Sequence, residues 1–356
     1  MGGFRPAPNW VGRDLLRLSV RNLRFAITNA VRWWRSHGFP YPSLSDLEVQ
    51  RDFTVVTRHD LPPMTCLDLP RSVQGLRVVN AFQPRLWHIP SHGRSVIDCF
   101  NDDELLHRAL VKAVGFWPNR HCWNASCVRN VLRLLHRTRP GNFRPIAARA
   151  IVERYTKPGE PVLDFCAGFG GRLLGTLAAR RTYVGIEPER EQVRGMCTML
   201  AALRIESKRA TLYEGRAEET LGELAWSSVG LILTSPPYFD QEQYSNHPDQ
   251  SMIRYPTLRV WLTDFLQPCL EECYRVLSVH GRLVINLADA NGHDLTRRFE
   301  RLLCSHYRIE EILRLPMRRN PAAVGSSFRF EPVYVLRKRA RRSAKPSNSV
   351  PAAFQE

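Results

Sequence analysis

Two short stretches in the second half of the chain carry residue types that could perform chemistry together. The first is T-S-P-P-Y-F at 234–239, which follows an apolar run at 229–233. Such a run predicts a buried parallel strand, and two prolines cannot continue its ladder of hydrogen bonds. The chain must therefore leave the sheet there, and it presents a hydroxyl, a rigid turn and an aromatic ring. The carboxyl end of a strand is where open α/β sheets bind ligands.

The second stretch is a glycine turn earlier in the chain. P-V-L-D at 161–164 predicts a strand, and C-A-G-F-G-G at 166–171 follows it. Glycines let the backbone approach a ligand where a side chain would block it. The next predicted strand ends at Glu187, 23 residues after Asp164. This is close to the ~20 residues at which an acid meets ribose hydroxyls in nucleotide-binding folds.

The two stretches resemble the motifs of a known enzyme family. D-x-x-x-G-x-G at 164–170 is similar to the first motif of class I S-adenosylmethionine-dependent methyltransferases. S-P-P-Y at 235–238 resembles the catalytic motif of the amino methyltransferases that act on cytosine N4 or adenine N6 in DNA. The likeness covers 142–337, about 55% of the chain. It implies S-adenosyl-L-methionine as cofactor, and DNA methylation as the activity.

The resemblance also implies a role for each matching residue. Asp164 would hold the amino end of the methionine, Glu187 the ribose hydroxyls, and Glu218 the adenine, although Glu218 equally well starts a helix. The implied cofactor-binding residues are Phe143, Arg144, Asp164, Cys166, Gly168, Gly170, Glu187 and Glu218. The implied catalytic residues are Ser235, Pro236, Pro237 and Tyr238.

The chemistry accounts for the catalytic residue types. An exocyclic amine is a poor nucleophile because its lone pair is delocalised into the base. The Ser235 hydroxyl and the Pro236 carbonyl can accept its two N–H bonds, Pro237 keeps that carbonyl turned inward, and Tyr238 can stack on the base. A base in a duplex must flip out to arrive there, which costs a few kcal/mol. Direct in-line transfer then depends chiefly on orientation, and no covalent cysteine intermediate is needed.

The loop after the catalytic motif is expected to grip the flipped base, or to be simply hydrophilic. Its candidate base-pocket residues are Phe239, Asp240, Glu242 and Tyr244. Serine at the first motif position resembles cytosine-N4 enzymes more than adenine-N6 enzymes. The order of the motifs is shared with methyltransferases of RNA and of protein glutamine. An RNA base methyltransferase and an inactive nucleic-acid-binding partner subunit therefore remain alternatives.

Alternating strands and helices from residue 141 predict an α/β fold. We expect a Rossmann-like, seven-stranded and mostly parallel sheet over 141–338. The predicted strands lie at 161–165, 182–186, 210–214, 229–234, 282–287, 308–314 and 331–336. Trp261 and Phe265 on a predicted helix at 257–277 are expected in the core.

Residues 1–140 are expected to form a mainly helical or irregular accessory region for DNA recognition. One amphipathic helix is predicted at about 11–36. It carries a row of arginines that either tracks phosphates or forms a solvated face: Arg13, Arg17, Arg21 and Arg24. A basic, disordered tail is predicted at 339–356.

The composition favours a polyanionic partner. The formal net charge is +17 over 356 residues, which favours nucleic acid, here double-stranded DNA. A cognate restriction endonuclease is compatible with this interpretation. The nine cysteines include no C-x-x-C pair, so neither a zinc ribbon nor a disulfide framework is predicted, and no metal is expected. No apolar run is long enough for a membrane span, and we expect a cytoplasmic, nucleoid-associated protein.

Overall fold

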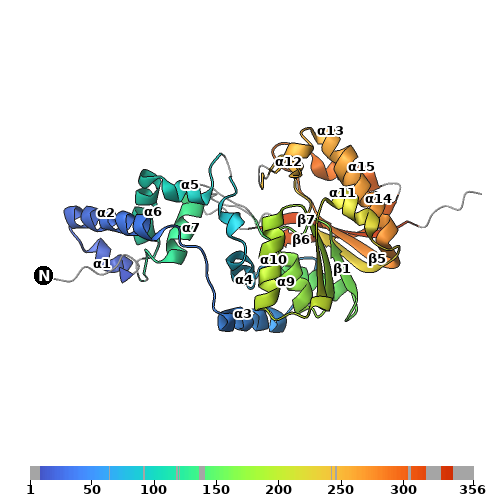
Figure 1. The fold of residues 1–356 in the computed structure, drawn as a ribbon, viewed down its shortest axis with the longest axis horizontal. Coiled ribbons are helices and arrows are strands. Elements are labelled where there is room, and N and C mark those ends of the chain that lie inside the picture. Colours follow the sequence, from blue (N-terminus) through green and yellow to red (C-terminus); the bar gives the residue numbers. More distant parts are fainter. Residues whose placement is uncertain are drawn as a thin grey trace, which may run out of the picture.

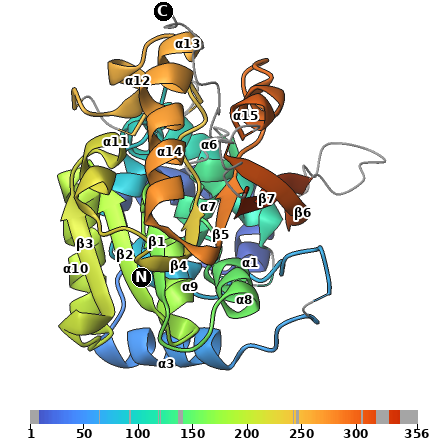
Figure 2. The same cartoon turned by 90° about the vertical axis from the view of Figure 1, so that its right-hand side faces the viewer.

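The computed structural model describes residues 9–63, 65–90, 93–117, 119, 121–135, 141–241, 243–244, 247–303, 306–317 and 330–339. Seven strands form one sheet in the order β3-β2-β1-β4-β5-β7-β6 (Figure 2). All neighbours pair in parallel except β7, which is antiparallel to both β5 and β6. The strands are β1 (Pro161–Asp164), β2 (Thr182–Glu187), β3 (Ala210–Glu214), β4 (Val229–Thr234), β5 (Leu277–Asn286), β6 (Tyr307–Pro316) and β7 (Phe330–Lys338). The predicted α/β fold with a seven-stranded, mostly parallel sheet is confirmed.

Both faces of the sheet are buried, which explains its continuous apolar runs. Side chains alternate between the faces along each strand, so Leu163 and Ile232 lie in one apolar cluster while Val162 and Leu231 lie in another. Figure 1 shows helices on either side of the central strands. One side carries α8 (Pro145–Tyr155), α9 (Gly171–Ala178) and α10 (Arg190–Ala202). The other carries α11 (Ala217–Thr220), α14 (Gln267–Val276) and α15 (Leu295–Leu303).

The segment before α8 touches the backbone of α9. A Cβ added at Gly171 would lie 2.0 Å from the Phe143 carbonyl oxygen, so only glycine permits this approach. The start of α8 is thereby fixed against the helix that follows the glycine turn. This contact places Phe143 and Arg144 beside the turn. Their binding of the cofactor stays a prediction.

The N-terminal region has two parts. A helical bundle lies at one end of the molecule, and two further helices lie against α9 and α10 (Figure 1). The bundle contains α1 (Gly12–Leu16), α2 (Val20–His37), α5 (Val96–Asn101), α6 (Asp103–Phe116) and α7 (Ala125–Leu135). The two helices at the sheet domain are α3 (Asp46–Arg58) and α4 (Leu76–Ala81). The single helix predicted at 11–36 is wrong: the chain breaks at 17–19, where the Ser19 hydroxyl accepts a 3.3 Å bond from the Asn22 amide and caps α2.

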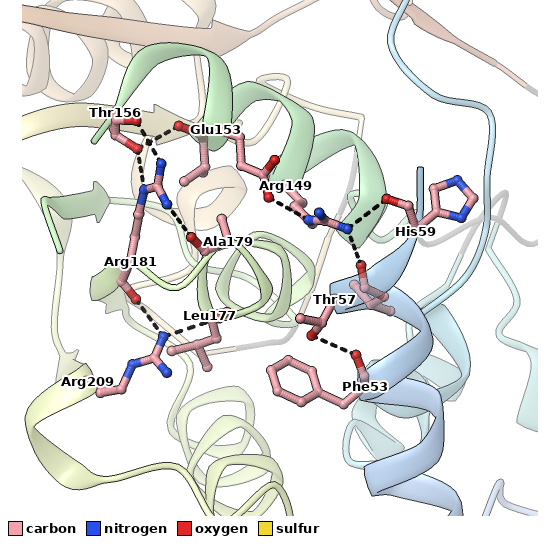
Figure 3. Close-up of polar contacts among 12 residues, drawn as sticks. Phe53, Thr57, His59, Arg149, Glu153, Thr156, Leu177, Ala179, Arg181 and Arg209 are labelled. Atoms are coloured by element: carbon pink, nitrogen blue, oxygen red, sulfur yellow. Dashed lines mark hydrogen bonds and ion pairs between the residues drawn. The ribbon is translucent and has the colours of Figure 1, made fainter. Parts of the chain in front are cut away.

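Polar contacts that are buried or partly buried join α3 and α4 to the sheet domain. Arg149 on α8 donates to the Val56 and His59 carbonyls at 2.7 and 2.9 Å, which satisfies the carboxyl end of α3 (Figure 3). Gln83, just after α4, donates through Nε2 to the Gln192 carbonyl on α10 at 3.0 Å. Gln50 reaches the Ala202 carbonyl at 2.9 Å. These contacts fix the segment from α3 to Gln83 on the sheet domain.

Among the described residues, no helix combines the length and the apolar character that a membrane crossing requires.

Candidate active site

The two chemistry-bearing turns lie at neighbouring strand ends. β1 pairs in parallel with β4, through Val162 with Leu231 and Leu163 with Ile232. From β1 the chain winds outward through β2 and β3, and it then returns to β4 on the other side of β1. The carboxyl ends of β1 and β4 therefore flank the point where the winding reverses, which is the binding crevice of such sheets. The structure brings the glycine turn and the S-P-P-Y turn together there.

Asp164 at the end of β1 lies beneath the glycine turn. Its side chain is fully buried and accepts bonds from Arg172 Nε at 2.7 Å and from the Tyr183 hydroxyl at 2.8 Å. Arg172 also donates to the Cys166 carbonyl, and its guanidinium lies 5.5 Å from the centre of the Phe143 ring. Through its bond to Arg172 the Asp164 carboxylate shapes the turn from below. Contact between Asp164 and the amino end of the methionine stays a prediction.

Glu187 at the end of β2 supports the same turn from the side. Its carboxylate accepts bonds from the Gly168 amide at 2.8 Å and from the Glu189 amide at 3.1 Å. Burial raises the pKa of Glu187 to about 7, although both amide bonds oppose that shift. Oxygens with spare lone pairs at this position can still accept ribose hydroxyls.

The outer face of the glycine turn is open. Gly168 has φ +57°, and a Cβ added there would find only the Cys166 carbonyl oxygen, at 3.8 Å. Gly170 has φ +86° and its missing Cβ would meet Met196 at 3.0 Å, so this second glycine serves packing. Burial raises the pKa of the Cys166 thiol well above its ordinary value. A protonated thiol is a weak nucleophile, which agrees with chemistry that needs no cysteine.

Glu218 is the second residue of α11 and lies in a cluster of charges. The Tyr255 hydroxyl donates to it, and Arg216 and Arg254 approach it at 3.6 and 3.8 Å. Arg216 also pairs with Asp249 at 3.0 Å. The cluster therefore ties the segment beyond the S-P-P-Y turn, which we call the catalytic turn after its predicted role, to the end of β3. Contact between Glu218 and a cofactor adenine stays a prediction.

The catalytic turn presents its predicted acceptors. Ser235 is half-buried and Pro236 is buried, and in the described part of the chain neither the Ser235 hydroxyl nor the Pro236 carbonyl has a hydrogen-bond partner. The Pro237 carbonyl instead accepts from the Phe239 amide at 2.9 Å, which closes the turn. Two acceptors at the site are thus unused by the turn itself.

Tyr238 is held from β7. Its hydroxyl donates to Glu331 Oε2 at 3.2 Å, and the Asn286 amide approaches the same oxygen at 3.5 Å. Asn286 also donates to the Pro332 carbonyl at 3.0 Å. The Tyr238 ring, 9% exposed, is therefore fixed at both its backbone and its hydroxyl.

The next two residues anchor the turn to the linker before α15. Phe239 has φ +53°, which is rare for a bulky side chain, and its buried ring lies 5.1 Å from His293 and 6.4 Å from Trp261. Asp240 accepts from Asn291 Nδ2 at 3.1 Å and lies 3.3 Å from His293 Nε2. The Phe239 ring packs inward and holds the turn. Its contact with a base stays a prediction.

The loop then passes over the glycine turn. The Tyr244 ring lies 6.0 Å from Phe169, and its carbonyl accepts from Arg85 Nε at 3.4 Å. Arg85 lies in the short helix η2 (Pro84–Trp87), so the N-terminal region contacts the site. Glu242 lies outside the described residues. Trp261 and Phe265 are 0% and 5% exposed, which confirms that they are core residues.

Sequence reasoning missed three residues that organise the site. Arg172, Glu331 and His293 each hold one of the predicted residues in place. For Arg172 a signal existed, because an arginine one residue into a buried helix start must find an acceptor nearby. Glu331 and His293 carry no such local signal.

No protein-family model matches the chain, and no curated protein matches its sequence. Solved structures of methyltransferases are similar in fold. TrmN from Thermus thermophilus is 15% identical over 56% of this chain and 50% of that chain, with a TM-score of 0.41. An rRNA methylase from Streptococcus thermophilus is 13% identical over 56% and 98%, with a TM-score of 0.37. Precorrin-6y C5,15-methyltransferase from Geobacter metallireducens is 14% identical over 53% and 84%, with a TM-score of 0.35. The chain thus spans about half the length of TrmN.

Proposed function

We propose that this protein is an S-adenosylmethionine-dependent methyltransferase that acts on an exocyclic amine of a nucleic-acid base. One observation carries the proposal: the glycine turn after β1 and the S-P-P-Y turn after β4 lie at adjacent strand ends, where the winding of the sheet reverses. A methyl donor held at the first turn would lie beside an amine held at the second.

The residues present fit the cofactor. The open face of Gly168 admits a ligand close to the backbone, and Glu187 lies at the neighbouring strand end, where ribose hydroxyls would be bound. Glu218, one strand further along, would lie near the adenine. S-adenosylmethionine supplies an electrophilic methyl group when bound. The protein must orient the attacking amine toward it and exclude water.

The catalytic turn can orient an amine. The Ser235 hydroxyl and the Pro236 carbonyl would accept its two N–H bonds and localise its lone pair. Tyr238 would stack on the base, with its ring already fixed by the bond to Glu331. Because the S-P-P-Y turn lies at the end of the central strand β4, a paired base must leave its helix to arrive there. Correct placement of the amine supplies most of the rate enhancement.

The substrate class follows from charge and from the first motif residue. A formal net charge of +17 favours a polyanion, and we take DNA as the substrate, with cytosine N4 ahead of adenine N6 because the motif begins with serine. RNA bases offer the same amines and are tested together with DNA. An inactive partner subunit would retain the fold without transferring a methyl group.

The test combines cofactor binding with product analysis. Calorimetry should show S-adenosylmethionine binding, and labelled methyl should pass to DNA, with N4-methylcytosine identified by mass spectrometry of nucleosides. Ser235→Ala should abolish transfer and spare cofactor binding, whereas the control Ser207→Ala, at the opposite edge of the sheet, should change neither. Methylated RNA without methylated DNA would replace the DNA substrate by RNA. Binding without transfer to any nucleic acid would refute the proposed activity.

A further inference from the structure

The outward face of α2 carries cations that the protein itself does not use. Arg21, Arg24 and Arg32 are exposed, and the helix contains no acidic residue. At 3.6 residues per turn, positions 21, 24, 25 and 32 fall on one side of the helix. Phe25, between the arginines, is 65% exposed. We call Arg21, Arg24, Phe25 and Arg32 the arginine face.

Arg35, on the same helix, differs from these arginines because its side chain makes bonds within the bundle. Arg35 bonds to Asp103 at 2.7 Å and to the Phe100 carbonyl, and it lies 5.3 Å from the centre of the Phe100 ring. By contrast, in the part of the chain that the structure describes, the side chains of Arg21, Arg24 and Arg32 make no hydrogen bond or ion pair. Like charges one turn apart on a helix repel each other. An anionic partner would remove that repulsion.

The spacing of the arginines suits a phosphate backbone. Arg21 and Arg32 are separated by about 16 Å along the helix axis. Phosphates of one duplex strand advance about 3.4 Å each along the axis, so the face spans about five of them. Guanidinium groups bind phosphate oxygens through two parallel bonds, and an exposed aromatic ring can stack on an unpaired base.

An anionic membrane surface offers phosphates too, but the helix is poorly built for it. A membrane-surface helix inserts its apolar face into the lipid. The apolar face of α2 is instead buried within the bundle, through Ala26, Ile27, Ala30 and Trp34. What remains outside carries three arginines among polar residues, and its exposed large apolar side chains are Val20 and Phe25. Two separate apolar side chains do not form an inserting face, which favours a hydrated phosphate backbone over a lipid interior.

The bundle is also joined to the candidate active site through a shared apolar cluster. Trp34 of α2 belongs to the same apolar cluster as Trp87 of η2 and Phe169 of the glycine turn. Arg85 in η2 contacts the Tyr244 carbonyl at the site. A nucleic acid bound along α2 would therefore be fixed in register with the catalytic turn.

We propose that the arginine face binds the phosphate backbone of the nucleic acid whose base enters the site. The identity of that partner rests on the proposed function, but the binding does not require methyl transfer. The face would supply sequence-independent affinity, and the catalytic turn would select the amine.

The test replaces Arg21, Arg24 and Arg32 together by Gln, which keeps the helix propensity. The matched control replaces three exposed cations at the amino-terminal edge of the sheet: Lys157, Arg180 and Lys208. Both variants lose the same charge. Fluorescence anisotropy with a short duplex DNA, a single-stranded DNA and an RNA hairpin measures affinity at several salt concentrations. Circular dichroism checks that both variants fold.

The α2 variant should bind about tenfold more weakly than the control. Its slope of log affinity against log salt should fall by about 2 to 3, because each removed arginine leaves one phosphate with its counterion. Equal affinities for the two variants would overturn the proposal. So would an unchanged affinity for nucleic acid together with weakened binding to phosphatidylglycerol vesicles, which would assign the face to a membrane.

Failure of the proposed function gives a different result. If the wild type methylates no nucleic acid but the α2 variant still loses affinity, the activity is wrong and the arginine face stands. If methylation proceeds with full affinity in the α2 variant, the activity stands and the face is wrong.

Discussion

The two turns of the candidate site are stabilised in different ways. The glycine turn is held by residues close in sequence: Asp164 binds Arg172 eight residues later, and Glu187 binds the Gly168 amide 19 residues earlier. The catalytic turn is held from far along the chain: Tyr238 bonds to Glu331, 93 residues away, and Asp240 to His293, 53 residues away. The first turn is a local structure, whereas the second depends on the finished fold.

The difference also concerns charge. The support of the glycine turn is a buried ion pair, 7% and 0% exposed at its two side chains. The catalytic turn is supported by half-exposed contacts, such as the pair of Asp240 with His293 at 32% and 33%. A buried pair is costly to break, because the remaining charge stays desolvated, whereas a half-exposed pair is screened by water. We therefore expect disruption of the glycine turn to unfold the protein more readily than disruption of the catalytic turn.

The largest expected effect comes from Asp164→Leu. The substitution leaves the buried Arg172 without its carboxylate, and we expect a loss of about 3–5 kcal/mol in the free energy of unfolding. Guanidinium unfolding curves measure it. The double variant Asp164→Leu/Arg172→Met should recover much of the loss, since apolar replacement of both partners is often tolerated. A loss below about 1 kcal/mol for the single variant would contradict the contrast between the turns.

The same contrast decides how much the sequence could predict. The glycine turn and the strands around it were predictable because β1, the glycines and Glu187 follow one another within a short segment. In that segment each apolar run is followed by glycines or by an acidic residue. The seven-stranded sheet followed from the alternation of apolar runs, and Trp261 and Phe265 were correctly placed in the core. These features depend on local periodicity and on burial of both sheet faces.

Features that depend on distant contacts were not predictable. Glu331 carries no local mark of its bond to Tyr238, because only the pairing of β5 with β7 brings it there. The packing of the Phe239 ring on His293 also has no local signal, because His293 comes from the linker that follows β5. The break between α1 and α2 is not predicted because apolar spacing continues across it, while the Ser19 cap begins a new helix at α2.

A second prediction concerns pH and the glycine turn. Burial raises the pKa of Glu187 from 4.5 to about 7, so folding favours its protonated form. Its contribution to stability is therefore present below pH 4.5 and is lost as the pH rises through about 7. The expected loss is about 3 kcal/mol, from 1.36 kcal/mol for each unit of pKa. Unfolding curves taken at several pH values give the free energy of unfolding of wild type and of Glu187→Gln. The two plots of this free energy against pH should converge or cross, because only the wild type has a carboxyl group that titrates at position 187. Parallel profiles would exclude this role of Glu187.

A third prediction separates folding from cofactor binding at the same turn. Gly168→Ala places a Cβ at φ +57° and into the open face. The backbone strain should cost about 1 kcal/mol of stability, and affinity for S-adenosylmethionine should fall because the Cβ occupies the approach. Gly222→Ala is the control, since Gly222 has no positive φ and no atom within 4 Å of its added Cβ. Unchanged cofactor affinity in Gly168→Ala would place the cofactor elsewhere.

The smallest expected effect tests the catalytic turn. Tyr238→Phe removes the hydroxyl that donates to Glu331 and keeps the ring, so it should cost only about 0.5–1.5 kcal/mol of stability. Because the ring is then fixed at its backbone alone, methyl transfer should slow severalfold while cofactor affinity stays constant. Glu331→Gln keeps an acceptor for the hydroxyl and should lie between wild type and Tyr238→Phe in rate.

The two variants together decide whether the catalytic turn depends on β7. If the bond between Tyr238 and Glu331 is the cause, the double variant Tyr238→Phe/Glu331→Gln should be no slower than Tyr238→Phe alone, because the hydroxyl is already absent. Independent, multiplying losses would mean that Glu331 acts on the substrate directly. The bond from Glu331 to Tyr238 would then contribute little to the rate, and the carboxylate would act mainly on the substrate. The conformation of the catalytic turn would in that case be determined as locally as that of the glycine turn.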